Sequence, residues 1–270
     1  MAPPRPVPPS ARPGARQRLR RLLLGATGFL LLLGLWQLLA SRAAANPVLL
    51  PPPGEVGRAA LELARGGFLW GDVLASLRRV GVGFLLAATA GVGLGAALGV
   101  GRRLAALFHP LLEALRPIPP IAWIPLAILW FGIGDAPSYF IVAIGAFFPV
   151  FVSTYDGIRQ VDPRFVQVAR CLGASGRRVT LEVVLPAALP SILTGLRVGL
   201  GFGWMAVVAA ELVAARSGLG YMIQVNRSLL ETARVLVGMG LIGLLGYLMS
   251  AALGWLAAVL FPWQTGGAER

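Results

Sequence analysis

The sequence predicts an all-α, polytopic membrane protein with about six transmembrane helices. The chain has 270 residues, of which 57% are hydrophobic and only 13% are charged. Soluble domains usually carry about 25% charged residues, so roughly half of the usual solvating surface is missing. Uncharged runs of the length that crosses ~30 Å of hydrocarbon recur along the chain. A core that faces lipid as well as itself explains this composition.

The uncharged runs place the membrane segments. The first run, 22–40, follows a basic, proline-rich stretch and so mimics a secretory signal, but it is longer than the ~7–15 residues of a signal core. We therefore interpret it as a transmembrane helix at the start of a permease domain that spans 22–263. The predicted spans lie near residues 22–40, 80–100, 117–134, 136–155, 183–210 and 235–261.

The segments outside the spans are predicted from composition and charge. Residues 1–21 combine proline and arginine and predict a disordered basic tail, and residues 264–270 form a short C-terminal tail. The region 41–79 is interpreted as an external loop with a short interfacial helix. Arginines are more frequent in the segments predicted to be inside, which places both termini in the cytoplasm. We also expect the chain to lie in a bacterial cytoplasmic membrane. Arg78 and Arg79 do not follow this bias, which favours an interfacial helix there.

The composition excludes several kinds of chemistry. All 24 basic residues are arginine, so the chain lacks the lysine that a P-loop ATPase or a Schiff-base enzyme needs. If ATP drives this protein, another polypeptide must hydrolyse it. A single cysteine, Cys171, and a single histidine, His109, exclude disulfide frameworks and zinc clusters. We expect no catalytic residue, metal or cofactor in this chain, and we attribute the net charge of +13 to membrane anchoring rather than to nucleic acid.

Three features in the predicted spans are candidates for packing or for a translocation pathway. Gly91, Gly95 and Gly99 recur every four residues and predict close helix packing. Pro120 and Pro125 interrupt an apolar run and favour a pathway-lining segment, with a plain helix start at the membrane surface as the alternative.

Arg197 and Glu211 are the ionisable groups inside the fifth predicted span. They lie about 21 Å apart along a helix and cannot pair directly. An intramembrane charge is a functional candidate. An arginine that faces a central cavity would suit an anionic substrate, and the alternative is that both side chains reach the nearest interface.

The loop 156–182 is long and polar, and it lies between two apolar runs. Its spacing predicts an amphipathic helix that ends at Gly173, a second turn at Ala174-Ser175-Gly176, and a Leu185-Pro186 pair where the next span begins. An ordinary capped helix explains only the first part. A short helix exposed at the end of a bundle can instead be held in a cleft of a partner.

These residues resemble the cytoplasmic "EAA" loop of ABC importer permeases in the nitrate/sulfonate/taurine branch, of the aliphatic sulfonate permease type. The family's Glu-Ala-Ala is replaced here by Gln167-Val168-Ala169, so two positions depart from the pattern. The sequence segments 116–134, 188–201 and 207–223 also resemble this permease family. The resemblance assigns the ATPase-coupling role to Gln167, Val168, Ala169, Arg170, Gly173, Ala174, Ser175, Leu185 and Pro186.

The resemblance implies the transmembrane-domain fold of ABC type I importers and a subunit without enzymatic activity of its own. It implies a homodimer, an ATPase subunit that carries ATP and Mg, and an extracytoplasmic substrate-binding protein. The substrate would be a small organic anion that crosses by alternating access. The alternative is an ion-gradient-driven secondary transporter or channel, which usually shows internal repeats that this sequence lacks.

Overall fold

The computed structural model describes residues 15–42 and 49–260, and these ranges contain helices and no strands. This confirms the predicted all-α class. In chain order the elements are α1 (Ala15–Arg42), α2 (Pro53–Arg65), α3 (Phe68–Val100), α4 (Arg102–Leu115), the 3₁₀ turn η1 (Pro120–Trp123), α5 (Ile124–Phe131), α6 (Asp135–Arg159), α7 (Pro163–Cys171), α8 (Gly176–Val179), the π-helical turn η2 (Thr180–Val184), α9 (Leu185–Ala214), α10 (Leu219–Ser228) and α11 (Thr232–Leu260).

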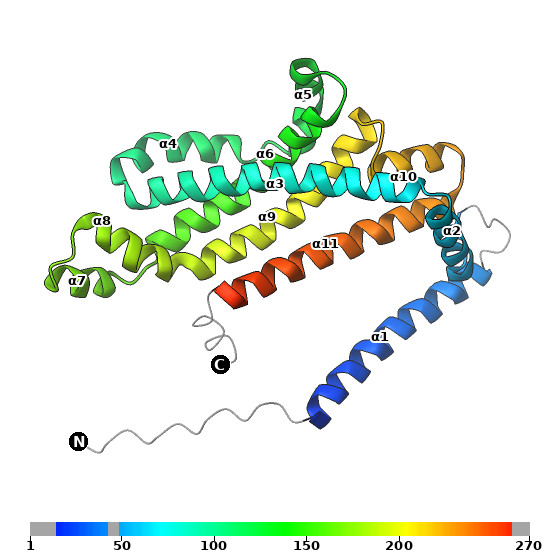
Figure 1. The fold of residues 1–270 in the computed structure, drawn as a ribbon, viewed down its shortest axis with the longest axis horizontal. Helices are drawn as coiled ribbons and strands as arrows, with labels where there is room; N and C mark the ends of the chain where they lie inside the picture. Colours follow the sequence, from blue (N-terminus) through cyan, green and yellow to red (C-terminus); the bar gives the residue numbers. More distant parts are fainter. Residues whose placement is uncertain (1–14, 43–48, 261–270) are drawn as a thin grey trace.

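The long helices form an elongated bundle with α7 and α8 at one end and α2 and α10 at the other (Figure 1). We call these the α7 end and the α10 end. In the described part of the chain, four helices are long and apolar enough to cross a membrane, and a fifth crossing is possible if a bent pair counts as one span. The four are α3, α6, α9 and α11. The predicted span 22–40 falls in α1, where Leu30–Arg42 is a shorter apolar stretch.

The third predicted span, 117–134, differs from a single straight helix. In the structure its residues form only the short η1–α5 segment, Pro120–Phe131, which meets the preceding helix α4 at an angle of 87°. Pro117, Pro119 and Pro120 explain the bend, because each ring removes a backbone donor and disfavours the α conformation of the residue before it. Pro125 is the second residue of α5, a position whose N–H has no intrahelical partner in any helix.

The ends of the chain also differ from the sequence-based boundaries. Helix α1 begins at Ala15, inside the segment that was predicted to be a tail. The rest of that segment, residues 1–14, and the predicted C-terminal tail lie outside the described residues. The predicted interfacial helix of region 41–79 corresponds in position to α2, and α3 begins already at Phe68, so Arg78 and Arg79 lie inside a long helix.

Helix α6 is the centre of the bundle, and α3 and α9 pack on two of its faces through glycines. A Cβ atom at Gly95 would lie 2.8 Å from Thr154 Cβ, and one at Gly99 would lie 2.8 Å from Ile158 Cγ2. On α9, a Cβ at Gly199 would lie 2.7 Å from Val150 Cγ2. The predicted role of the α3 glycines in helix packing is therefore confirmed. Such contacts drive helix association in lipid, where the hydrophobic effect between helices is absent.

We predict that Gly95→Val lowers the thermal stability of the detergent-purified protein, because the added methyl groups overpack the α3–α6 contact at a cost of about 1–3 kcal/mol. Gly93→Val is the matched control, since a Cβ at Gly93 meets nothing within 4 Å. The measurement is the temperature at which half of the monodisperse peak is lost in size-exclusion chromatography. Equal temperatures for the two variants would contradict the packing argument.

Candidate functional site

Helix α7 is a short helix that is capped at both ends. Asp162 precedes it and its Oδ1 accepts a hydrogen bond from the Arg164 N–H at 2.8 Å, while Pro163 occupies the first helical position. At the other end the Ala174 N–H donates to the Ala169 carbonyl at 3.0 Å and the Gly173 N–H donates to the Arg170 carbonyl at 2.9 Å. This pair of bonds is a Schellman motif.

Gly173 has φ +82°, the left-handed conformation that glycine adopts without a steric penalty. The Ala169-to-Gly173 spacing that sequence analysis singled out is therefore the geometry of a helix stop. Ala174 and Ser175 continue from it into α8, whose N-cap is Ser175.

One face of α7 presents apolar side chains to the outside. Phe165, Val168 and Leu172 are all exposed, and Leu172 is 83% exposed. Their spacing of three and four residues places them on one stripe of the helix. Gln167, Arg170 and the free Cys171 are exposed beside it. A rigid helix with an uncovered apolar stripe is a surface for a protein partner.

The segment after α7 passes directly into a long membrane helix. The turn η2 is π-helical and α9 follows without a break, so Gly176–Ala214 forms one long helical unit. Pro186 explains the wide turn, because its ring lacks an N–H and would collide with the carbonyl four residues earlier in a regular α-helix. Leu185 and Pro186 therefore mark the start of α9, as the sequence predicts.

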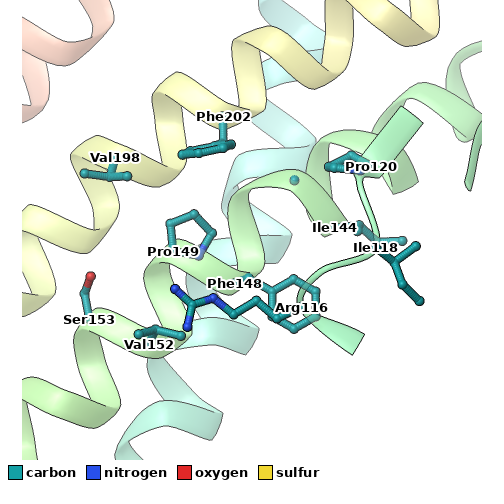
Figure 2. Close-up of a pocket in the computed structure, with 11 residues that line it drawn as sticks. Arg116, Ile118, Pro120, Ile144, Phe148, Pro149, Val152, Ser153, Val198 and Phe202 are labelled. Atoms are coloured by element: carbon teal, nitrogen blue, oxygen red, sulfur yellow. The ribbon is translucent and has the colours of Figure 1, made fainter. Parts of the chain in front are cut away.

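A cavity of about 330 Å³ lies between the η1 segment, α6 and α9 (Figure 2). Most of its lining is apolar, with Phe148 and Phe202 as the aromatic members. Arg116 and Ser153 contribute polar groups. Figure 2 shows the Arg116 side chain lying along α6, with its guanidinium near Val152. Arg116 also pairs with Glu113 at 3.5 Å, an exposed contact that is worth little energy in water.

The cavity includes only one of the four residues proposed for a pathway. Pro120 lines it, whereas Pro125 is exposed at the start of α5 and is absent from the lining. Arg197 extends toward α11, where a Cβ on Gly254 would lie 2.9 Å from its Nη2. Glu211 is buried elsewhere, at the α10 end. The cation of this cavity is therefore Arg116, which sequence analysis assigned no role.

A buried ionic network, the Arg79 cluster, lies at the α10 end and consists of Ser76, Arg79, Asp135 and Glu211. Arg79 and Glu211 are 3% and 1% exposed. Arg79 Nη1 lies 2.9 Å from Glu211 Oε1, and Arg79 Nη2 lies 2.6 Å from Asp135 Oδ1. Ser76 Oγ donates to the Glu211 carboxylate at 2.8 Å. The cluster thus joins α3, α6 and α9.

The loop before α10 completes this cluster. The Ser217 carbonyl accepts a hydrogen bond from Arg79 Nη1 at 2.6 Å, and the Gly220 N–H donates to Glu211 Oε2 at 2.8 Å. Gly218 has φ +109°, and a Cβ there would collide with the Glu211 carboxylate. The glycines of this loop let its backbone reach the buried acid. Each charge in the cluster is consequently paired and hydrogen-bonded, which is the condition for burying it.

Sequence reasoning found Glu211 but missed its partners. Arg79 was noted only because it does not follow the charge bias, and Asp135, which lies between the predicted spans 117–134 and 136–155, was assigned no role. The signal that could have connected them is the Ser-Gly-Leu-Gly run 217–220, which begins six residues after Glu211. In the described residues no three His, Cys, Asp or Glu side chains gather closely enough to hold a metal ion.

The fold and these sites define a membrane transport subunit. Its structure matches a chain of the inward-facing MetNI methionine ABC transporter with a TM-score of 0.53 at 20% identity, over 68% of this chain and 95% of that one. At that identity the match shows the fold, which is that of an ABC importer transmembrane domain.

The chain belongs to the family described as binding-protein-dependent transport system inner membrane component, whose model matches residues 89–265. It is 38% identical to the taurine transport system permease protein TauC of Escherichia coli K12, over 91% of each chain. It is 35% identical to the putative aliphatic sulfonates transport permease protein SsuC of Bacillus subtilis 168, over 94% of this chain and 91% of that one. It is a multi-pass permease subunit of an ABC importer.

We predict that Arg79→Met strongly destabilises the protein, because it leaves the buried Glu211 and the partly exposed Asp135 without this cation. Breaking a buried pair in this way costs about 3–5 kcal/mol. Arg78→Met is the matched control, since Arg78 is 66% exposed and lies 3.8 Å from Asp135. Thermal unfolding of the two purified variants makes the comparison, and an Arg79→Met protein as stable as Arg78→Met would contradict a structural role of the cluster.

Proposed function

We propose that two copies of this permease form the membrane pathway of an ATP-driven importer for a small organic anion of the sulfonate, taurine or nitrate type. A separate ATPase subunit holds ATP and Mg and docks on α7. An extracytoplasmic binding protein delivers the substrate at the α10 end. Both termini and the α7 end face the cytoplasm.

The main observation in support of this proposal is the exposed apolar stripe of α7. Caps at both ends of this nine-residue helix satisfy backbone groups there and define where the helix begins and ends. Its apolar stripe is costly in water, so a partner that covers Phe165, Val168 and Leu172 gains hydrophobic energy. Gln167 stands where the family has a glutamate, so this docking relies more on the apolar stripe than on a charge.

The chemistry of the cavity supports an anionic substrate. Its volume of about 330 Å³ is at the lower end of the range for small-molecule sites, which suits a compact ligand. The Arg116 guanidinium offers donors in a planar fork that matches the oxygens of a sulfonate or nitrate. The apolar lining beside it would accept a short carbon chain. The taurine permease among the relatives is named for such a molecule.

We predict that Leu172→Glu reduces co-purification of the ATPase subunit by roughly tenfold or more, as expected for a central interface residue. The bundle should stay folded, because Leu172 is almost fully exposed. Leu61→Glu is the control, since Leu61 is an exposed leucine on α2 at the opposite end. Undiminished capture of the ATPase by Leu172→Glu would refute docking on α7.

We predict that Arg116→Gln lowers ATP-dependent uptake of a tested anion such as taurine, with the loss mainly in the apparent affinity. Loss of a charged hydrogen bond costs about 1.5–3 kcal/mol, which corresponds to roughly a tenfold to hundredfold change. Arg116→Lys should retain part of the activity, and Arg197→Gln is the control for charge removal outside the cavity.

Vesicle uptake distinguishes the proposed ATP-driven importer from the alternative, an ion-gradient-driven secondary transporter or channel. Uptake that continues without the ATPase subunit and follows a proton gradient would favour a secondary transporter. An Arg197→Gln defect larger than that of Arg116→Gln would transfer the anion-binding role to Arg197.

A further inference from the structure

A second pocket, of about 490 Å³, opens where the start of α4 meets the last turns of α6, at the α7 end of the bundle. Its lining includes Arg102 and His109 from α4 and Tyr155 and Arg159 from α6. All of its lining residues belong to the described part of the chain, and none is acidic. It shares no lining residue with the Arg116 cavity.

Hydrogen-bond donors converge in this pocket around Tyr155. Arg159 Nη1 donates to the Tyr155 hydroxyl oxygen at 3.1 Å, and the guanidinium lies 5.5 Å from the Tyr155 ring centroid. The His109 ring is 4.6 Å from the same ring. Because the Tyr155 oxygen accepts from Arg159, its own O–H remains available as a donor. Two guanidinium groups, a phenol and an imidazole N–H thus face one space.

The two arginines of this pocket have no acidic partner, whereas five other arginines of the described chain do. Arg116 pairs with Glu113, Arg178 with Glu182 and Arg234 with Glu231. Among the described residues neither Arg102 nor Arg159 forms an ion pair. Two cations on one pocket wall repel each other, so an anion from outside the chain would relieve an unfavourable charge arrangement.

The surroundings indicate where that anion comes from. The pocket lies directly after the apolar span of α3, which ends at Val100, so it is at the depth where a membrane surface begins. Beside the pocket, α4 exposes a row of apolar side chains that would contact acyl chains: Leu104, Leu107, Phe108 and Leu111. Tyrosine at such a boundary keeps its ring in the apolar layer and its hydroxyl at the polar side.

We propose that this pocket binds the phosphodiester group of an anionic phospholipid, with Arg102, Tyr155 and Arg159 as the donors. Basic pockets between transmembrane helices on the cytoplasmic side are a recognised geometry for such headgroups. The bound headgroup joins the start of α4 to the end of α6. Arg159 is the last residue of α6, and Asp162 caps α7 three residues later. The bound lipid therefore also stabilises the position of the start of α7.

The binding test does not require transport or the ATPase, so it can fail or succeed independently of the proposed function. The full-length chain is purified, stripped of lipid and titrated with phosphatidylglycerol in native mass spectrometry. Arg102→Gln and Arg159→Gln should each lower the affinity by roughly fivefold, the effect expected for one arginine at an anionic surface. Arg103→Gln is the matched control, because Arg103 is the exposed neighbour that does not line the pocket.

A second variant separates loss of binding from loss of folding. Ala106→Glu places a carboxylate at an exposed lining position on α4 and should also reduce phosphatidylglycerol binding while the chain elutes as wild type. Phosphatidylcholine and inorganic phosphate are titrated as further probes, and both should bind weakly. Wild-type affinity in Arg102→Gln and Arg159→Gln, or an equal loss of affinity in Arg103→Gln, would overturn the proposal that this pocket binds the lipid. Phosphate that displaces the lipid fully would overturn the lipid as its occupant.

Discussion

The close approach of α3 and α9 to α6 is the constraint on which the other features of this permease depend. It requires glycine at the contact points, because a single Cβ at Gly95 or Gly199 would already lie under 3.0 Å from an α6 side chain. With two faces of α6 occupied in this way, its third side faces the Arg116 cavity. The Arg79 cluster lies at one end of α6. At the other end begins the segment from α7 to η2, which we call the coupling segment. One helix therefore positions the Arg116 cavity, the Arg79 cluster and the exposed helix α7.

The Arg79 cluster holds the α10 end together in a different manner. Packing between glycine faces carries no directional bond, whereas a guanidinium shared by Asp135, Glu211 and Ser217 adds directional bonds that fix angle and register. Taking these charges out of water costs free energy. The ion pairs and hydrogen bonds offset that cost only while all partners stay in place. The α10 end should consequently move as a unit during transport.

The sequence was sufficient for features that depend on local composition and insufficient for those that depend on distant partners. Gly173 as a helix stop, Pro186 at a helix start and the glycine face of α3 follow from local rules, and the structure has them. A single span was predicted at 117–134, where the structure has only the short η1–α5 segment, because hydropathy averages over the break that the prolines introduce. The pairing of Arg79 with Glu211 joins residues 132 positions apart, a distance that no periodicity spans. Arg197 was predicted as the candidate cation for an anionic substrate because the sequence shows that it lies within an apolar run. The sequence does not show the direction of its side chain, so Arg116 was missed.

The position of the coupling segment explains how docking on α7 would reach the cavity. The segment begins where α6 ends and continues through η2 into α9, and these same two helices supply opposite walls of the Arg116 cavity. Near the α7 end they touch so closely that a Cβ on Gly157 would collide with Ser191, which leaves no room for independent movement. A partner that pulls α7 therefore displaces both walls together. In the proposed dimer, such a displacement would open or close the cavity against the second copy rather than widen it within one chain, in agreement with the rigid α10 end.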